Sequence, residues 1–329
     1  MAEQNNKKGS KIHGLVLLKG APGKEKPDES TYAFESVDQE KKIKLAHQLV
    51  PYRSVYLYSI MLINDSLAPI TEIKIRIKFP EFLVLSRINP PEFSTNPPQR
   101  DNLGSQQVNF EIDELSESSQ KQINFYFNPV PRNNKGDVNT YITYVNNKDF
   151  VRVLNSDTKK IEIILPKIEP KIISSAKISE FLKIEGIKKA VKSLGIGTKN
   201  KVDLDLYFSH IEQLLGMHKF QLIAKDDKKK IAWFYGTDLI SKQEILVIGQ
   251  IVSDKVEFLA AAQIHPVLIS LLAMLSEDYK KRITSIGIVK SPNEIFDLEC
   301  DFCGAIFDRF PAKGESIECK NCHRVQTVW

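Results

Sequence analysis

Cysteine is scarce in this chain of 329 residues: there are four, and all of them lie between residues 300 and 322. The preceding sequence can form no disulfide, which is typical of proteins that fold in a reducing compartment. Long hydrophobic runs are also missing, because the richest stretches, Ile245–Val252 and Val267–Leu275, fall well short of the roughly 20 apolar residues of a membrane span. The polar N-terminus, Met1–Lys11, has no apolar core of a signal peptide behind it. We therefore expect a soluble, cytoplasmic protein.

Strong charge imbalance and catalytic motifs are absent as well. The chain has 46 Lys and Arg against 41 Asp and Glu, a net charge of +5, whereas a dedicated nucleic-acid binder usually concentrates a larger basic excess. The six histidines are scattered, and no HExxH helix, Walker loop or GxGxxG turn occurs. The sequence thus favours a non-enzymatic protein.

The first half of the chain predicts β-structure. Residues 1–30 read as a flexible arm with a first strand at Ile12–Leu18, and residues 31–165 then show alternation with a period of two. The clearest case is Glu72–Phe79, in which charged and apolar side chains alternate, as expected of a half-buried strand. About 130 residues of short strands with turn-rich connections predict an all-β sandwich of the immunoglobulin or arrestin type. Such sandwiches mostly serve as binding platforms.

The pattern changes at residue 166, so that the fold class as a whole is mixed. Apolar residues from Ile178 to Leu194 recur at three and four positions and predict an amphipathic helix. A second helix follows at 204–215, with Asp203 at its start and Gly216 at its end, then four strands and a helix from Pro266. Residues 166–283 therefore predict an α+β platform-like domain in the order α-α-β-β-β-β-α. Residues 284–297 predict a linker into a small module at 298–329.

The four cysteines form the strongest motif of the sequence. Cys300 and Cys303 make one CxxC pair, and Cys319 and Cys322 make a second pair fifteen residues later. Two such turns supply four sulfurs to one tetrahedral zinc ion, so the spacing predicts a C-terminal zinc ribbon with one structural Zn²⁺. The alternatives are unpaired thiols or an iron–sulfur cluster.

The charges of two segments bear on the class of partner. The segment Lys171–Lys201 has eight lysines and two glutamates, which indicates either contact with an anionic membrane surface or a solvated helix face. The ribbon itself has nearly balanced charge, which favours protein contact or a purely structural role over nucleic acid. Peripheral membrane contact stays open, and nucleic acid is the disfavoured partner.

An aromatic strand supplies the candidate for partner binding. In Trp233-Phe234-Tyr235, alternation sends Trp233 and Tyr235 to one face of a sheet and Phe234 to the other. We expect a peptide groove beside Trp233 and Tyr235, rimmed by lysines of the 225–230 loop, or alternatively packing of these rings in the core. The lysines proposed for the rim are Lys228, Lys229 and Lys230.

The α+β region resembles the platform of the appendage (ear) domains of vesicle-coat adaptors, most of all the coatomer γ-subunit appendage. The resemblance is carried by Ile211–Met217, which is similar to that family's helix ending in Leu-Gly-Met, and by the strands and final helix after it. It implies a non-enzymatic domain in which a β-sandwich precedes the platform and a peptide groove, often floored by an aromatic residue, recruits accessory proteins. Trp233 would hold that position. The zinc ribbon departs from the family pattern.

Together these features predict a non-enzymatic cytoplasmic adaptor or scaffold that binds proteins or peptides in a vesicle-coat or trafficking-like assembly. The alternative is a nucleic-acid-associated zinc-ribbon factor. A steep salt dependence of nucleic-acid binding would distinguish the second hypothesis from the first.

Overall fold

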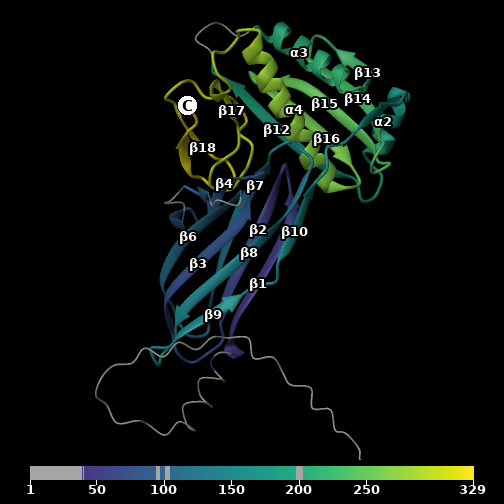
Figure 1. Ribbon diagram of the computed structural model, residues 1–329. Helices are drawn as coiled ribbons and strands as arrows, with labels where there is room; N and C mark the ends of the chain where they lie inside the picture. Colours follow the sequence, from purple (N-terminus) through teal and green to yellow (C-terminus); the bar gives the residue numbers. More distant parts are fainter. Residues whose placement is uncertain (1–38, 40, 94–96, 101–103, 198–202) are drawn as a thin grey trace, which may run out of the picture.

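The computed structural model describes residues 39, 41–93, 97–100, 104–197 and 203–329. The predicted arm and the strand at Ile12–Leu18 lie outside these residues. The described chain forms a β-sandwich, an antiparallel sheet with helices on both faces, and a small C-terminal segment beside them (Figure 1). The expectation of an all-β first half is confirmed.

Two sheets make up the sandwich. One has four strands in the order β1-β2-β7-β4, and the other has the order β10-β8-β3-β6-β5, with β9 paired to β8. The strands are β1 Ile43–Tyr52, β2 Val55–Asn64, β3 Ile70–Pro80, β4 Leu83–Asn89, β5 Gln99–Arg100, β6 Ser105–Leu115, β7 Ser119–Pro129, β8 Asn134–Val145, β9 Val151–Asn155 and β10 Lys159–Ile163. A short 3₁₀ turn, η1, spans Pro91–Phe93.

The alternation in the sequence explains how the sandwich closes. On β3, the apolar residues Ile73, Ile75 and Ile77 are buried between the sheets, whereas Lys74 and Arg76 face solvent. Burying one face of each sheet in this way is the main stabilising contribution of such a fold.

The second unit is a seven-stranded sheet in the order β11-β14-β15-β16-β12-β17, with β13 paired to β14. Its strands are β11 Ile168–Pro170, β12 Lys188–Ile196, β13 Gln221–Asp226, β14 Ile231–Asp238, β15 Glu244–Val252, β16 Lys255–Ala262 and β17 Ile295–Asp297. Helices α3 (Leu204–Met217) and α4 (His265–Ser285) pack on one face and form the larger core there. The short helix α2 (Ser175–Phe181) packs on the other face.

The prediction of one helix from Ile178 to Leu194 is wrong. Helix α2 ends at Phe181, and residues 188–196 form strand β12, so the order begins α-β-α instead of α-α. Gly186, with a φ of +86°, lies in the turn between α2 and β12, and this left-handed conformation is incompatible with a helix that continues to Leu194. The two-residue alternation typical of a strand is not visible in the sequence, because a charged residue, Lys192, occupies a buried position facing α4. The basic segment is therefore not one helix face.

Residues 284–297 are not a simple linker. Helix α4 runs to Ser285, a 3₁₀ turn, η2, spans Pro292–Glu294, and β17 joins the sheet by pairing with Leu194–Ile196 of β12. The predicted helix with Asp203 at its start is confirmed as α3, where the Asp203 carboxylate accepts hydrogen bonds from the backbone of Asp205 and Leu206. No helix in the described part of the chain is long and apolar enough to cross a membrane.

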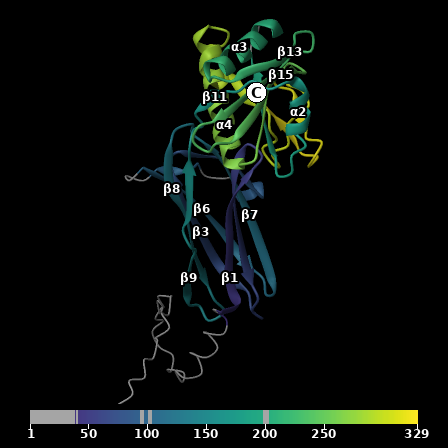
Figure 2. The same ribbon diagram turned by 90° about the vertical axis from the view of Figure 1, so that its right-hand side faces the viewer.

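The C-terminal segment lies against the same sheet face as α2 (Figure 2). A Cβ atom on Gly195 of β12 would lie 2.3 Å from the ring of Phe310, so glycine is needed for this close approach. Only one short hairpin is regular here, β18 (Ser316–Glu318) with β19 (Val325–Thr327). Around the first CxxC turn, the strand pairing is limited to a single bridge between Glu299 and Ile306.

Candidate metal centre and partner surface

The two CxxC motifs form turns of the same geometry. In the first, the amide of Gly304 donates to the Cys300 carbonyl at 2.8 Å, and in the second the amide of His323 donates to the Cys319 carbonyl at 2.8 Å. Gly304 has a φ of +69° and His323 a φ of +57°, so both turns need a left-handed residue directly after the second cysteine. His323 takes the position at which glycine is the residue that adopts this conformation most readily.

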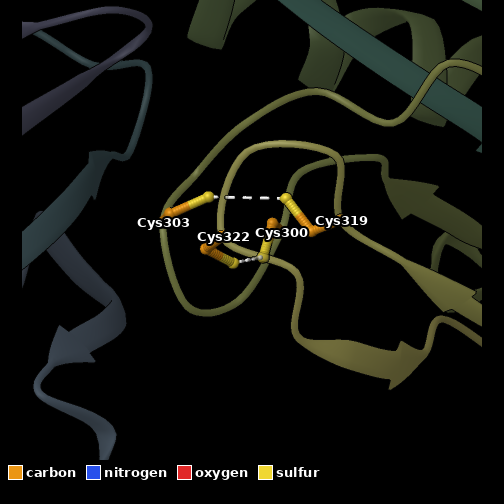
Figure 3. A group of neighbouring side chains, drawn as sticks. All are labelled: Cys300, Cys303, Cys319 and Cys322. Carbon is orange, nitrogen blue, oxygen red and sulfur yellow. Dashed lines mark hydrogen bonds between the residues drawn. The ribbon is translucent and has the colours of Figure 1, made fainter.

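These turns bring the four sulfurs to one point (Figure 3). All four Sγ atoms lie within 4.8 Å of one another, with 3.6 Å between Cys300 and Cys322 and 3.5 Å between Cys303 and Cys319. A disulfide requires about 2.05 Å, whereas a tetrahedral metal with bonds of about 2.3 Å requires sulfurs about 3.8 Å apart. The four thiols are free, and their arrangement fits a single metal ion.

Burial separates two of the four sulfurs from solvent. Cys300 and Cys319 are buried, and burial raises the pKa of the Cys300 thiol to about 12. Because a metal binds the thiolate, a cation at this point is what would hold that sulfur deprotonated at neutral pH. Four protein sulfurs fill a tetrahedral coordination sphere, so the site is of the closed, structural kind.

The chain enters the metal site through Glu299, which joins all three units. Its carboxylate, 12% exposed, accepts a hydrogen bond from Ser54 Oγ at 3.1 Å and forms ion pairs with Arg87 and Lys192, each at 3.5 Å. Ser54 and Arg87 belong to the sandwich, and Lys192 belongs to β12. A buried carboxylate requires such partners because its desolvation is costly.

Lys192 is at the centre of these ion pairs. Its Nζ also lies 2.9 Å from Asp297, which in turn pairs with Lys280 of α4 at 3.0 Å. Burial alone would lower the pKa of Lys192, but Glu299 and Asp297 outweigh it and raise that pKa. Burial likewise acts to raise the pKa of Asp297, and the two lysines lower it to about 2. Both groups are therefore charged at neutral pH.

A second polar contact fixes the C-terminal segment to the sheet. Lys255 of β16, which is buried, donates to the Phe307 carbonyl at 2.6 Å and pairs with Glu257 at 2.8 Å. Beyond it, the rings of Phe310 and Trp329 stack with centroids 5.1 Å apart. Phe310 also stacks on Phe296 of β17, with centroids 6.2 Å apart, so polar contacts and aromatic packing together hold the segment on the sheet.

The aromatic strand divides as alternation predicts. Trp233 and Tyr235 pack in the α2 cluster, and Phe234 packs in the core under α3 and α4. Trp233 is partly exposed, but Tyr235 is 2% exposed, meets Phe181 edge-on and donates to Glu244. The expectation that Tyr235 lines an open groove is therefore wrong, because α2 covers it.

The three lysines do not rim Trp233 as a group. Lys228 and Lys229 are exposed in the β13–β14 turn. Lys230 binds Asp205 of α3, on the sheet face opposite Trp233, and neighbouring Lys225 pairs with Glu212 of α3 at 3.0 Å. The turn is therefore drawn toward α3, which weakens its assignment to a groove at Trp233.

An apolar row crosses the sheet on the α2 face and was not recognised from the sequence. Strand register places Trp233, Ile248, Leu259 and Val191 side by side on β14, β15, β16 and β12, and all four are partly exposed. On one side of this row, α2 covers Tyr235, Leu246 and Ala261, and on the other the C-terminal segment covers Gly195 and contacts Lys255. Only the strand register could have revealed the row.

The Val191 end of the row opens into a hollow of about 310 Å³. Its lining includes Arg53 and Ser54 of the sandwich, Lys189 and Val191 of β12, and Ile306 of the C-terminal segment. A larger hollow of about 790 Å³ lies on the other side of Ala305 and Ile306, toward Ser316–Glu318. The row and the first hollow are therefore framed by all three units.

Comparison with known proteins shows no family. No family model matches the chain, and no curated protein matches it. A search of solved structures finds an inactive mutant of the GH20 exo-β-N-acetylglucosaminidase of Vibrio harveyi, at 9% identity and a TM-score of 0.21, covering 67% of this chain and 39% of that one. Spo0M of Bacillus subtilis has 7% identity and a TM-score of 0.19, covering 64% of this chain and 75% of its own.

A DUF4466 family protein of Parabacteroides merdae has 7% identity and a TM-score of 0.22, covering 66% of this chain and 98% of its own. At such low scores these likenesses support no conclusion about the chain. None of the three is a coat appendage domain, and the resemblance to appendages stays a prediction.

Proposed function

We propose that the protein is a non-enzymatic cytosolic adaptor that binds short segments of partner proteins on the α2 face of its seven-stranded antiparallel sheet. The observation that supports this is the row of Trp233, Ile248, Leu259 and Val191, four large apolar side chains that stay partly exposed. Apolar side chains gathered on a surface and bounded by polar groups are typical of protein-binding sites.

The chemistry of the partner follows from the two ends of the row. At one end, Trp233 offers a large aromatic face, and buried aromatic contacts contribute much of the energy in peptide complexes. At the other end, the exposed cations Arg53 and Lys189 line the hollow beside Val191. A peptide with an apolar or aromatic anchor and an acidic residue a few positions away matches this arrangement.

The metal is proposed to be zinc, in a structural role. Four sulfurs at the spacing of a tetrahedron are the donor set of structural zinc sites, and they leave no open coordination position for a substrate. Elemental analysis of the purified protein should find one zinc per chain. Iron with visible absorbance would assign the site to an iron centre instead.

We also propose that the protein acts in a trafficking-like assembly. A β-sandwich followed by a helix-backed sheet is the organisation that the resemblance to coat appendages implies, and it supports a trafficking-like assembly. Peripheral membrane contact has weaker support, because exposed Lys177 and Lys183 flank Glu180 and Glu185. The nucleic-acid alternative also has little support, since Arg309, Lys320 and His323 of the ribbon each pair with an acidic side chain.

A displayed peptide library tests the proposed surface. Binders selected on the wild-type protein should be enriched in aromatic residues with acidic neighbours, and Leu259→Glu should weaken them at least tenfold by placing a charge in the row. The matched control is Leu67→Glu, because Leu67 is 88% exposed on the sandwich. An absence of selected binders, or equal binding by the Leu259→Glu variant, would contradict the proposal.

A further inference from the structure

The loaded metal site carries a net charge that its own segment balances poorly. Four thiolates around a divalent ion sum to −2, and two of the four cysteines are fully buried. Three cations of the segment, Arg309, Lys320 and His323, are each paired with acidic groups of that segment. A fourth, Arg324, lies over the ring of Phe302, 4.8 Å from its centroid, and is a cation that the segment itself places beside the first CxxC turn. A buried net charge is stable only with a counter-charge close by.

The sandwich places two arginines against the first CxxC turn. Arg53, in the β1–β2 turn, donates to the carbonyl of Gly304, the residue directly after Cys303. Arg87, on β4, lies so close that a Cβ atom on Gly304 would be 2.0 Å from its Nη2. Figure 3 shows Cys303 on the side of the site that faces the sandwich strands.

Arg87 is a buried cation with unused hydrogen-bond donors. Its side chain is 6% exposed and lies over the ring of Tyr126, 3.9 Å from the ring centroid. Its ion partner Glu299 is shared with Lys192, and among the described residues its Nε and Nη2 have no hydrogen-bond acceptor. Asp301, between the two cysteines of the first CxxC motif, is a further acidic group near Arg87, but it accepts no hydrogen bond from these two nitrogens. Unused donors on a buried guanidinium are unfavourable unless further negative charge lies beside them.

We propose that Arg53 and Arg87 are positioning residues of the metal centre, through which metal binding is coupled to docking of the sandwich on the C-terminal segment. The thiolate-bound metal supplies the negative charge that the orphaned face of Arg87 lacks, and the two arginines offset the charge of the metal site. Because such coupling is reciprocal, bound metal stabilises the docked arrangement to the same extent. The inference rests on the proposed metal site and not on the peptide surface.

The first test measures zinc affinity of the full chain by competition with a chromophoric chelator. Outer partners of a metal site typically change affinity by about 10–100-fold, so Arg87→Met and Arg53→Ala should weaken zinc binding by at least tenfold. Arg87→Lys, which keeps the charge, should restore part of the loss. Arg76→Ala is the matched control, because Arg76 is an exposed arginine of the other sandwich sheet.

The second test separates charge compensation from a purely structural effect. With Co²⁺ as the bound metal, removing the cation beside the sulfurs should shift the thiolate-to-cobalt charge-transfer band to lower energy. The shift should occur in Arg87→Met and be absent in Arg76→Ala. A band that is unchanged in every variant would contradict the proposal.

The third test uses the reciprocal effect and does not depend on the folding of the Arg87 variants. Removing zinc from the wild-type protein should increase hydrogen exchange in β4 and in the β1–β2 turn, which carry the two arginines. Equal exchange with and without zinc, or equal zinc affinity in all variants, would overturn the coupling. A wild-type chain that binds no zinc or cobalt would instead overturn the metal site itself.

Discussion

Replacing Lys192 with methionine is the sharpest test of the ion pairs that join the three units. The substitution keeps an unbranched side chain only one atom shorter, but leaves the carboxylates of Asp297 and Glu299 without their shared cation. Removing one partner of a buried ion pair typically costs about 3–5 kcal/mol. Since Asp297 keeps Lys280 and Glu299 keeps Arg87, we expect a loss near the lower limit, about 3 kcal/mol.

Tryptophan fluorescence during urea unfolding measures this loss in the right part of the chain. The protein has two tryptophans, Trp233 on β14 and Trp329 in the C-terminal segment, so the signal reports on the units that Lys192 joins. Zinc must be equal in all samples, because a bound ligand shifts the apparent stability. Lys183→Met serves as the control, since Lys183 is exposed.

A double-mutant cycle with Glu299→Gln then isolates the pair itself. If Lys192 and Glu299 interact as described, the two losses should be non-additive by about 1 kcal/mol or more. A loss for Lys192→Met within about 0.5 kcal/mol of the Lys183 control, which is the range of ordinary surface substitutions, would refute the reasoning.

Three further outcomes are expected. Asp297→Asn should lower the free energy of unfolding by about 1–2 kcal/mol at pH 7. A pKa lowered from 3.8 to about 2 corresponds to at most about 2.5 kcal/mol, and partial exposure of the carboxylate reduces this value. The difference from wild type should persist above pH 4 and vanish as the pH falls through 2, as measured by unfolding at each pH. Gly195→Ala should displace Phe310 and lower the free energy of unfolding by about 1–3 kcal/mol. Gly216→Ala, at a position with open space around it, should not destabilise the protein. Cys319→Ser should abolish zinc binding and expose Trp329 to solvent, seen as a red shift of emission, while circular dichroism retains the strands of the two larger units.

The features that could be predicted from the sequence are those in which the signal is local. The four cysteines that could hold a metal ion follow from two CxxC turns, and the burial of β3 follows from strict alternation along Glu72–Phe79. The sequence predicts a helix in place of strand β12 because Ile187, Val191 and Leu194 match a helical spacing. The buried Lys192 interrupts the alternation of apolar and polar residues that would indicate a strand. Gly186 was the local signal against a continuous helix.

The features that could not be predicted depend on contacts between distant parts of the chain. Arg87 and Glu299 are separated by 212 positions, and Lys192 and Glu299 by 107. Each of these residues is unremarkable in its own segment, and only the fold makes them partners. The apolar row has the same origin, since its members come from four strands and meet through register alone.

The position of Glu299 gives these distant contacts a common origin. Because Glu299 directly precedes Cys300, its carboxylate and the first metal ligand are fixed by the same turn. A change in that turn must therefore move the partner that Arg87 and Lys192 share, and with it the contact between sandwich and sheet. The hollow beside Val191 is lined by Glu299 and by Gly304–Ile306 of this turn, so its shape depends on the same few residues. The proposed metal site, the docking contacts of the three units and the far end of the proposed peptide surface therefore all depend on one short stretch of chain.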